Sequence, residues 1–350
     1  MDFKKWTIRY LGTLAVLAAV VAGIVWYIDP LFHYHKPLPF LHYAINSERS
    51  QNDGILRNFD YELIITGTSM TENFKTSDAE SLFGMKAVKV PYSGAPFGYV
   101  DEALRRSLKR RPGTKIVIRS IDATMLFEDA KDMIGGDYED PTWLYDDNPF
   151  NDVKYLFNKK VLMERIYQML RDYRAGKAGG IDSFDEAYNW MWEAHFGGTW
   201  VIPEGKVFPA PKELEELSQE DKDYLQYNIR EHFCAAAAEN PDITFYYFFP
   251  PYSIAWWGDI YSEGQLHRQV EAHRIVIDEM LKYDNIRVFG FNDLFEITTE
   301  IDNYYGDTHY GEEINTLLLE HMAEGESEIT EENVEKYCEQ LERFYGMFPY

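Results

Sequence analysis

A long apolar run near the start of the chain constrains its fold more than any other feature. Residues 10–28 contain no charged side chain, and this is about the length that a helix needs to cross the hydrocarbon core of a bilayer. Basic residues precede the run, namely Lys4, Lys5 and Arg9, and Trp26 and Tyr27 close it. The positive-inside rule therefore predicts a cytoplasmic tail at 1–9, a single transmembrane helix at 10–28 and an extracytoplasmic remainder.

A cleaved signal peptide is the alternative, because it also begins with basic residues and an apolar stretch. The run is longer than the core of a usual signal, and it ends in bulky residues instead of a small-residue cleavage site. We therefore favour a signal anchor in the cell membrane. Residues 29–58 are rich in proline at their start and predict a linker and packing segment. His33 and His35 in this segment have no further ligands nearby in sequence, which favours a packed role over metal binding.

The net charge belongs to the part of the chain after the apolar run. The 350 residues hold 34 Lys and Arg against 59 Asp and Glu, a formal charge of -25. Residues 1–30 sum to +1, so about -26 falls on the rest. This charge argues against a nucleic-acid partner, because phosphate contacts need a positive field. Two cysteines are too few for a disulfide framework or a structural zinc site, and we expect no cofactor and no metal ion.

The remainder predicts an α/β fold. Five short β-rich runs occur at 62–66, 87–91, 115–119, 243–249 and 286–289. Helical patterns lie between them, as is typical of a parallel sheet covered by helices. We expect a flavodoxin-like three-layer α/β/α domain at 59–323 with about five parallel strands. A helical insertion at about 150–240 would form a cap holding Trp190, Trp192 and Trp200, and an acidic helix would occupy 324–350.

Candidate catalytic residues follow the predicted strands, because ligands bind beyond the carboxyl ends of parallel strands. Gly67 allows a tight turn after the first strand, and Ser69 follows near a helix N-terminus, where backbone amides can stabilise an oxyanion. The simpler interpretation is that Ser69 only caps that helix. Asn73 lies in the same stretch, and the amide of Gly94 in the loop after the second strand could point into the same crevice.

A base for Ser69 is available near the C-terminus. A serine hydroxyl is a poor nucleophile at neutral pH and needs a base such as His309. That histidine needs an acceptor to fix its tautomer, which Asp307 or, alternatively, Asp302 would supply. A double proline after the fourth strand precedes Tyr252, whose neighbouring aromatic residues would either form a stacking surface for a sugar or pack under the insertion.

These blocks resemble the SGNH/GDSL hydrolase superfamily, which has Gly-x-Ser after the first strand, Gly after the second, Asn after the third and Asp-x-x-His near the end. Gly67-Thr68-Ser69, Gly94 and His309 match in family order over about residues 60–315. More narrowly, the chain is similar to membrane-anchored proteins of Gram-positive bacteria that are distantly similar to the teichoic acid D-alanyl transfer protein and alginate O-acetyltransferase-type proteins. The resemblance implies Ser69 as nucleophile, His309 as base, Asp307 as orienting acid and the Ser69 and Gly94 amides as oxyanion hole.

The sequence departs from the family pattern at two places. Gly306 stands where the family has its aspartate, so that Asp307 is only two residues before His309. The third strand runs into Asp122 without the family's asparagine, and an ionised carboxylate cannot donate to an oxyanion. The candidates for oxyanion or substrate binding are Gly67, Asn73, Gly94, Asp122 and Tyr252.

The sequence thus predicts a membrane-anchored serine esterase or O-acyltransferase that acts on a cell-envelope polysaccharide or teichoic acid. Transfer would need an acyl donor delivered across the membrane, and hence a multi-span acyltransferase as partner, because one span cannot deliver it. The alternative is a catalytically impaired binding or assembly protein of cell-envelope biogenesis, which the two departures favour.

Overall fold

The computed structural model describes residues 3–128, 141–191 and 194–350. The chain divides into two compact units. The first comprises Met1–Phe59 and Asp137–Ser183, and the second comprises Asp60–Gly136 and Phe184–Tyr350. Residues 29–58, expected to be a linker and packing segment, belong to a compact unit together with the first part of the segment expected as an insertion.

The first unit begins with helix α1 (Phe3–Ile28), which is long and apolar enough to cross a membrane by length and composition. A two-stranded parallel sheet joins β1 (His42–Tyr43) to β5 (Gly180–Ile181). The other elements that the structure describes in this unit are helical: α2 (Glu48–Asn58), η3 (Thr142–Leu144), α5 (Val153–Leu156), the π-helical segment η4 (Val161–Ile166) and α6 (Tyr167–Arg174).

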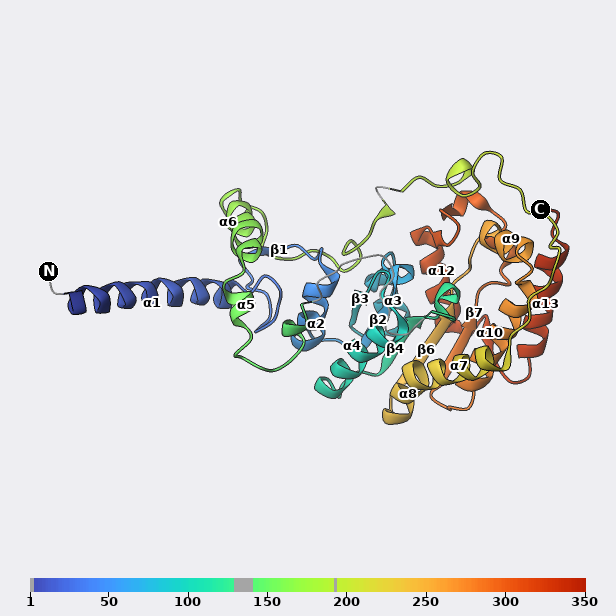
Figure 1. Ribbon diagram of the computed structural model, residues 1–350, viewed down its shortest axis with the longest axis horizontal. Coiled ribbons are helices and arrows are strands. Elements are labelled where there is room, and N and C mark those ends of the chain that lie inside the picture. Colours follow the sequence, from blue (N-terminus) through green and yellow to red (C-terminus); the bar gives the residue numbers. More distant parts are fainter. Residues whose placement is uncertain (1–2, 129–140, 192–193) are drawn as a thin grey trace. The chain divides into compact units, whose positions relative to one another are not determined.

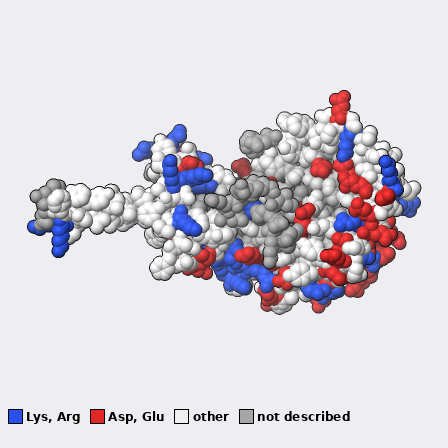
Figure 2. Space-filling model, viewed as in Figure 1, with Lys and Arg blue, Asp and Glu red and all other residues white. Residues whose placement is uncertain are grey.

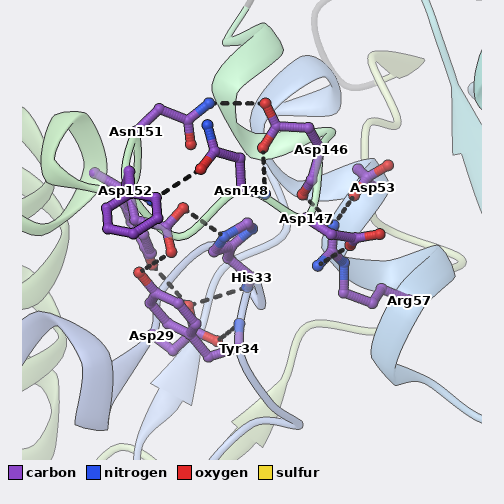
Figure 3. A network of polar contacts seen from close by, with 12 residues as sticks. Asp29, His33, Tyr34, Asp53, Arg57, Asp146, Asp147, Asn148, Asn151 and Asp152 are labelled. Carbon is purple, nitrogen blue, oxygen red and sulfur yellow. Dashed lines mark hydrogen bonds and ion pairs between the residues drawn. The ribbon is translucent and has the colours of Figure 1, made fainter.

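The chain leaves α1 through a turn that one buried carboxylate holds together (Figure 3). Asp29 has a φ of 47° and accepts hydrogen bonds from the backbone amides of His33, Tyr34 and His35 and from the hydroxyl of Tyr155. The Nε2 of His33 lies 3.3 Å from a carboxylate oxygen of Asp152. Because these contacts fix the backbone directly after α1, the start of the expected linker is an ordered turn.

The second unit contains a six-stranded sheet in the order β10-β7-β6-β4-β2-β3. Its strands are β2 (Leu63–Gly67), β3 (Ala87–Pro91), β4 (Ile116–Ser120), β6 (Thr244–Phe249), β7 (Ile286–Gly290) and β10 (Glu328–Ile329). The first five are parallel, and in chain order they follow the 2-1-3-4-5 pattern of flavodoxin-like folds. The predicted fold class is confirmed, with one addition: β10 pairs antiparallel with β7 at the edge, within a segment expected to be helical.

Helices cover both faces of this sheet (Figure 1). On one side α3 (Thr76–Phe83) packs on α12 (Glu312–Glu324), and on the other lie α4 (Phe97–Arg110), α7 (Gln219–Ile229) and α10 (Leu266–Met280). Further helices among the described residues of the unit are α8 (Ala235–Glu239), α9 (Ile254–Ser262), α11 (Phe295–Thr298), α13 (Val334–Met347), the π-helical η7 (Arg230–Cys234) and the short 3-10 helices η1 (Ser69–Thr71), η2 (Ala123–Met125), η6 (Gly198–Trp200) and η8 (Ile301–Asn303).

The central strands are buried on both faces, which explains their almost continuous hydrophobic sequences. Two charged side chains interrupt them, and backbone carbonyls satisfy both. The ammonium of Lys89 donates to the carbonyls of Glu72 and Phe74, and the guanidinium of Arg119 donates to other carbonyls beside the sheet. Strand register aligns Gly67 with Pro91, so the loops after β2 and β3 leave the same edge side by side.

Candidate active site

The turn after β2 requires glycine at position 67. Gly67 has a φ of 145°, and a Cβ atom there would lie 2.4 Å from the hydroxyl of Ser120. The next residue, Thr68, caps η1, since its hydroxyl accepts a hydrogen bond from the amide of Met70. Ser69 is therefore not the cap, which removes the simpler interpretation of this serine and frees its side chain for another contact.

The hydroxyl of Ser69 lies 2.9 Å from Nε2 of His309, although 240 positions separate the two residues in sequence. His309 begins β9 (His309–Tyr310), which pairs antiparallel with β8 (Tyr304–Tyr305). With the imidazole proton on Nδ1, Nε2 accepts the hydrogen bond from Ser69. This is the arrangement in which a general base can take a proton from a serine nucleophile.

Burial lowers the pKa of His309 below its ordinary value, and the charge of Asp307 opposes this shift only in part. The ring of Trp190 covers the imidazole edge-on, with the ring centroids 5.5 Å apart. Neutral imidazole is therefore the form present near pH 7, and neutral imidazole is the form that can accept a proton from Ser69.

The structure does not bring either expected carboxylate into hydrogen-bond contact with His309 among the residues that it describes. Asp307 is exposed, and its backbone carbonyl accepts hydrogen bonds from the amide and hydroxyl of Ser253. Asp302 is also exposed and lies against the backbone of Gly197. The group beside Nδ1 is the hydroxyl of Thr308, at 3.3 Å. Asp307 thus acts on His309 through its charge, and Thr308 supplies the acceptor.

Asp122 lies under the nucleophile turn and is fully buried. Its carboxylate accepts hydrogen bonds from the hydroxyls of Thr68 at 3.0 Å, Ser120 at 3.0 Å and Tyr252 at 3.3 Å. Burial raises the pKa of Asp122 to about 6, against the opposing effect of these hydrogen bonds. Asp122 and Tyr252 thus belong to a buried hydrogen-bond network beneath the turn that carries Ser69. Thr68 and Ser120 also belong to this network, and the sequence analysis did not identify them.

The backbone amides of Ser69 and Gly94 are the candidates for oxyanion donors. Gly94 has a φ of 64° in the loop after β3, and the neighbouring amide of Tyr92 donates to the carbonyl of Gly67 at 2.8 Å. Within the described parts of the chain, the amides of Ser69 and Gly94 donate to no other residue. Asn73, by contrast, is buried, and its side-chain oxygen accepts a hydrogen bond from the amide of Trp190.

Part of the segment expected as a cap reaches the site. Asn189 donates to the carboxylate of Glu312, which also pairs with Lys75 at 3.0 Å, and Trp190 packs against His309 and Tyr305. These contacts hold the segment over the histidine loop. The two other expected tryptophans do not contribute in the same way: Trp200 is exposed and stacks on His195, and Trp192 lies outside the described residues.

Together the fold and the site define an α/β protein with a Ser-His pair at the carboxyl edge of a parallel sheet. No family model and no curated protein matches this chain. Among solved structures it is similar to an acetyl xylan esterase (Est2A) from the rumen bacterium Butyrivibrio proteoclasticus, with a TM-score of 0.35 and 8% sequence identity. The match covers 75% of this chain and 62% of that chain, so this protein spans less than two thirds of the esterase. Similarity at this level carries no argument about function.

Proposed function

We propose that this protein is a membrane-anchored, extracytoplasmic serine esterase or O-acyltransferase of SGNH/GDSL type that acts on a cell-envelope glycopolymer. The observation that carries the proposal is the 2.9 Å contact between the hydroxyl of Ser69 and Nε2 of His309. A serine within hydrogen-bond reach of a neutral, partly buried imidazole at this edge of a parallel sheet fits nucleophilic acyl transfer.

In the proposed reaction, the oxygen of Ser69 attacks the carbonyl carbon of an ester while its proton passes to Nε2 of His309. The amides of Ser69 and Gly94 donate to the oxyanion of the tetrahedral intermediate. The intermediate collapses when the ester C–O bond breaks and the leaving alcohol takes the proton from His309. Meanwhile the hydroxyl of Thr308 accepts from Nδ1, and the charge of Asp307 favours the imidazolium.

The acyl group on Ser69 then passes to an acceptor. Water as acceptor makes the protein an esterase, and a sugar hydroxyl makes it a transferase. Transfer requires an acyl donor on the outer side of the membrane, which a multi-span partner would supply. The proposed substrate is a cell-envelope polysaccharide or teichoic acid, and α1, as a membrane span with its N-terminus in the cytoplasm, would place the site beside it.

Fluorophosphonate labelling of the full-length protein in detergent tests the nucleophile. We expect the wild type to be labelled at Ser69, and Ser69→Ala and His309→Ala to lose the label. Ser81→Ala is the matched control, because Ser81 is an exposed serine on α3 and its loss leaves the site unchanged. A wild type that resists labelling, or a Ser69→Ala variant that keeps the label, would contradict the proposal.

The second candidate is a binding or assembly protein that has kept the fold and lost catalysis. The exposure of Asp307, with no hydrogen bond to His309 among the described residues, favours it. Complementation of a deletion strain separates the two. A binding role predicts that Ser69→Ala restores the wild-type phenotype in full, whereas a catalytic role predicts no rescue at equal protein level.

A further inference from the structure

The excess of acidic residues lies entirely in the second unit. That unit contains 21 Lys and Arg against 46 Asp and Glu, whereas the first unit contains 13 of each and is neutral. Within the first unit, residues 150–177 hold seven basic and three acidic side chains. A chain with a net charge of -25 therefore carries a locally cationic segment in the same unit as its apolar helix.

This cationic segment also exposes large apolar side chains. Six of them are exposed between residues 153 and 174, compared with seven in the described residues of the whole second unit. The six are Val153, Phe157, Met163, Tyr167, Leu170 and Tyr173. Met163, Tyr167 and Leu170 follow one another at spacings of four and three, which places them on one side of the helical segment, while Ile166 and Met169 are buried. We call the six residues the α5–α6 surface.

The basic residues of the segment are largely unpaired. Lys154, Lys159, Lys160, Arg171 and Arg174 form no ion pair with any residue that the structure describes. Figure 2 shows Lys and Arg side chains gathered on the part of the first unit that carries α6. In the second unit, by contrast, basic residues such as Lys75, Arg230 and Arg287 pair with carboxylates. Cations without internal partners are available to bind an external anionic surface.

The contact with α1 fixes the level of this surface along the helix. Both α5 and η4 pack against α1, whose buried residues are Val25 and Ile28 in its last turns. These two residues are only about 4.5 Å apart along the helix axis. Trp26 and Tyr27 between them are exposed aromatic residues of the kind that lie at the boundary between lipid and water. The α5–α6 surface therefore lies at the level of that boundary.

We propose that the α5–α6 surface lies in the membrane interface and binds anionic lipid headgroups, as a second membrane contact beside α1. The apolar side chains enter the boundary between headgroups and acyl chains, and the unpaired Lys and Arg residues contact lipid phosphates. This inference rests on α1 as a membrane span, which belongs to the proposed function, and it is independent of the Ser-His chemistry.

Lipid quenching in the full-length protein tests this contact. An environment-sensitive dye is attached to Leu170→Cys, and the native Cys234 and Cys338 are buried and so protected from labelling. The protein is reconstituted into bilayers that contain brominated lipids, with either 30% phosphatidylglycerol or phosphatidylcholine alone. We expect strong quenching in the anionic bilayer and weaker quenching in the zwitterionic one. A dye on Leu82→Cys, at an exposed position of the second unit, is expected to stay unquenched.

Charge variants test the headgroup contact. The measured quantity is the ratio of molecules whose α5–α6 surface is inserted in the bilayer to molecules whose surface is in water. We expect Lys159→Gln with Lys160→Gln to lower this ratio roughly fivefold for each charge removed, and hence about 25-fold. Lys212→Gln with Lys336→Gln removes two exposed cations of the second unit and is expected to change nothing. Circular dichroism of each variant verifies that the helices are retained.

The remaining outcomes contradict the proposal in distinguishable ways. A dye on Leu14→Cys in α1 reports the span itself. Quenching at position 14 without quenching at position 170 overturns only the α5–α6 contact, and no quenching at either position overturns the anchor as well. Equal quenching in both bilayers overturns headgroup binding. Protection of position 170 that depends on the protein-to-lipid ratio instead of lipid charge would show a second copy of the chain on this surface.

Discussion

Replacing Asp122 with asparagine separates the cost of its buried charge from the benefit of its hydrogen bonds. Asp122 is fully buried under the nucleophile turn, and one of its oxygens accepts from both Thr68 and Ser120. The side-chain oxygen of asparagine can take over this position, and its amide can donate to the hydroxyl of Tyr252. Asp122→Asn therefore keeps the turn in place and removes the desolvated charge.

The shift in the pKa of Asp122 gives the size of the expected change in the free energy of unfolding. This pKa rises from 3.8 to about 6 in the folded state because of burial, which corresponds to about 3 kcal/mol. Since the folded-state pKa is the higher one, the folded protein binds more protons than the unfolded chain between about pH 4 and pH 6. The free energy of unfolding thus falls as pH rises through this window. We expect Asp122→Asn to be more stable than wild type at pH 7 by up to about 3 kcal/mol and to show no such gain below about pH 4.

Urea unfolding of the full-length protein in detergent, measured from pH 4 to pH 7, checks this expectation. Asp293 is the matched control, because burial also raises its pKa to about 6 and it lies apart from the hydrogen bonds of the nucleophile turn. Each asparagine variant should remove about half of the fall in stability that the two carboxylates cause together. His273 and His309, whose pKa values burial lowers, contribute equally to wild type and variants and cancel in the difference. An Asp122→Asn variant with the pH profile of wild type would refute the reasoning.

Two further predictions concern the turn and the base. Gly67→Ala combines a left-handed backbone with a Cβ atom 2.4 Å from the hydroxyl of Ser120, and we expect it to lower the free energy of unfolding by about 1–3 kcal/mol. It should also slow labelling, whereas Gly84→Ala, with a φ of 67° and open space around the added atom, should destabilise less and leave labelling unchanged. The rate of fluorophosphonate labelling of the wild type should fall only as pH drops through the lowered pKa of His309. Trp190→Ala uncovers the imidazole ring, and we expect it to move the midpoint of this pH dependence up toward 6.5. A midpoint that stays in place would show that Trp190 does not desolvate the base.

The central sheet could be predicted because each of its parallel strands is marked by a short hydrophobic run in its own sequence. Each of the five parallel strands is buried on both faces and reads as a short hydrophobic run, and the predicted runs agree with the observed strands to within one residue. By contrast, β10 has only two residues, Glu328 and Ile329, and exists through its pairing with β7. A strand of this length has no periodicity of its own that a sequence pattern can reveal.

The first unit could not be predicted from the sequence, because it depends on contacts between segments that are far apart along the chain. It depends on the pairing of His42 with Gly180 across a long separation and on the buried carboxylate of Asp29, which meets Tyr155 from the distant segment. Neither contact follows from a local pattern. The expectation of a linker therefore followed from the prolines, while the structure depends on partners more than a hundred residues away.

In the candidate site, Ser69 and His309 could be expected to meet, because one follows a strand end and the other stands in a loop near the C-terminus where the chemistry needs a base. The acceptor for Nδ1 could not be predicted in this way. Spacing pointed to Asp307 or Asp302, but the carbonyl of Asp307 is bound by Ser253, and its side chain is turned to solvent. Asp307 stands two positions before His309, in the turn between β8 and β9, and the hydroxyl beside the ring belongs to the intervening Thr308.

The unequal charge of the two units bears on how this protein could bind an anionic polymer. A net charge of -25 for the whole chain implies repulsion from every anionic surface, yet the first unit is neutral, and five of its cations form no ion pair with any carboxylate that the structure describes. The second unit alone carries the repulsive field, and cations such as Lys75 and Arg287 are engaged in ion pairs. An anionic polymer that reaches Ser69 therefore gains nothing from long-range attraction. Its binding must come from short-range contacts with the loops at the sheet edge, and should consequently strengthen at high salt, where the field of the second unit is screened.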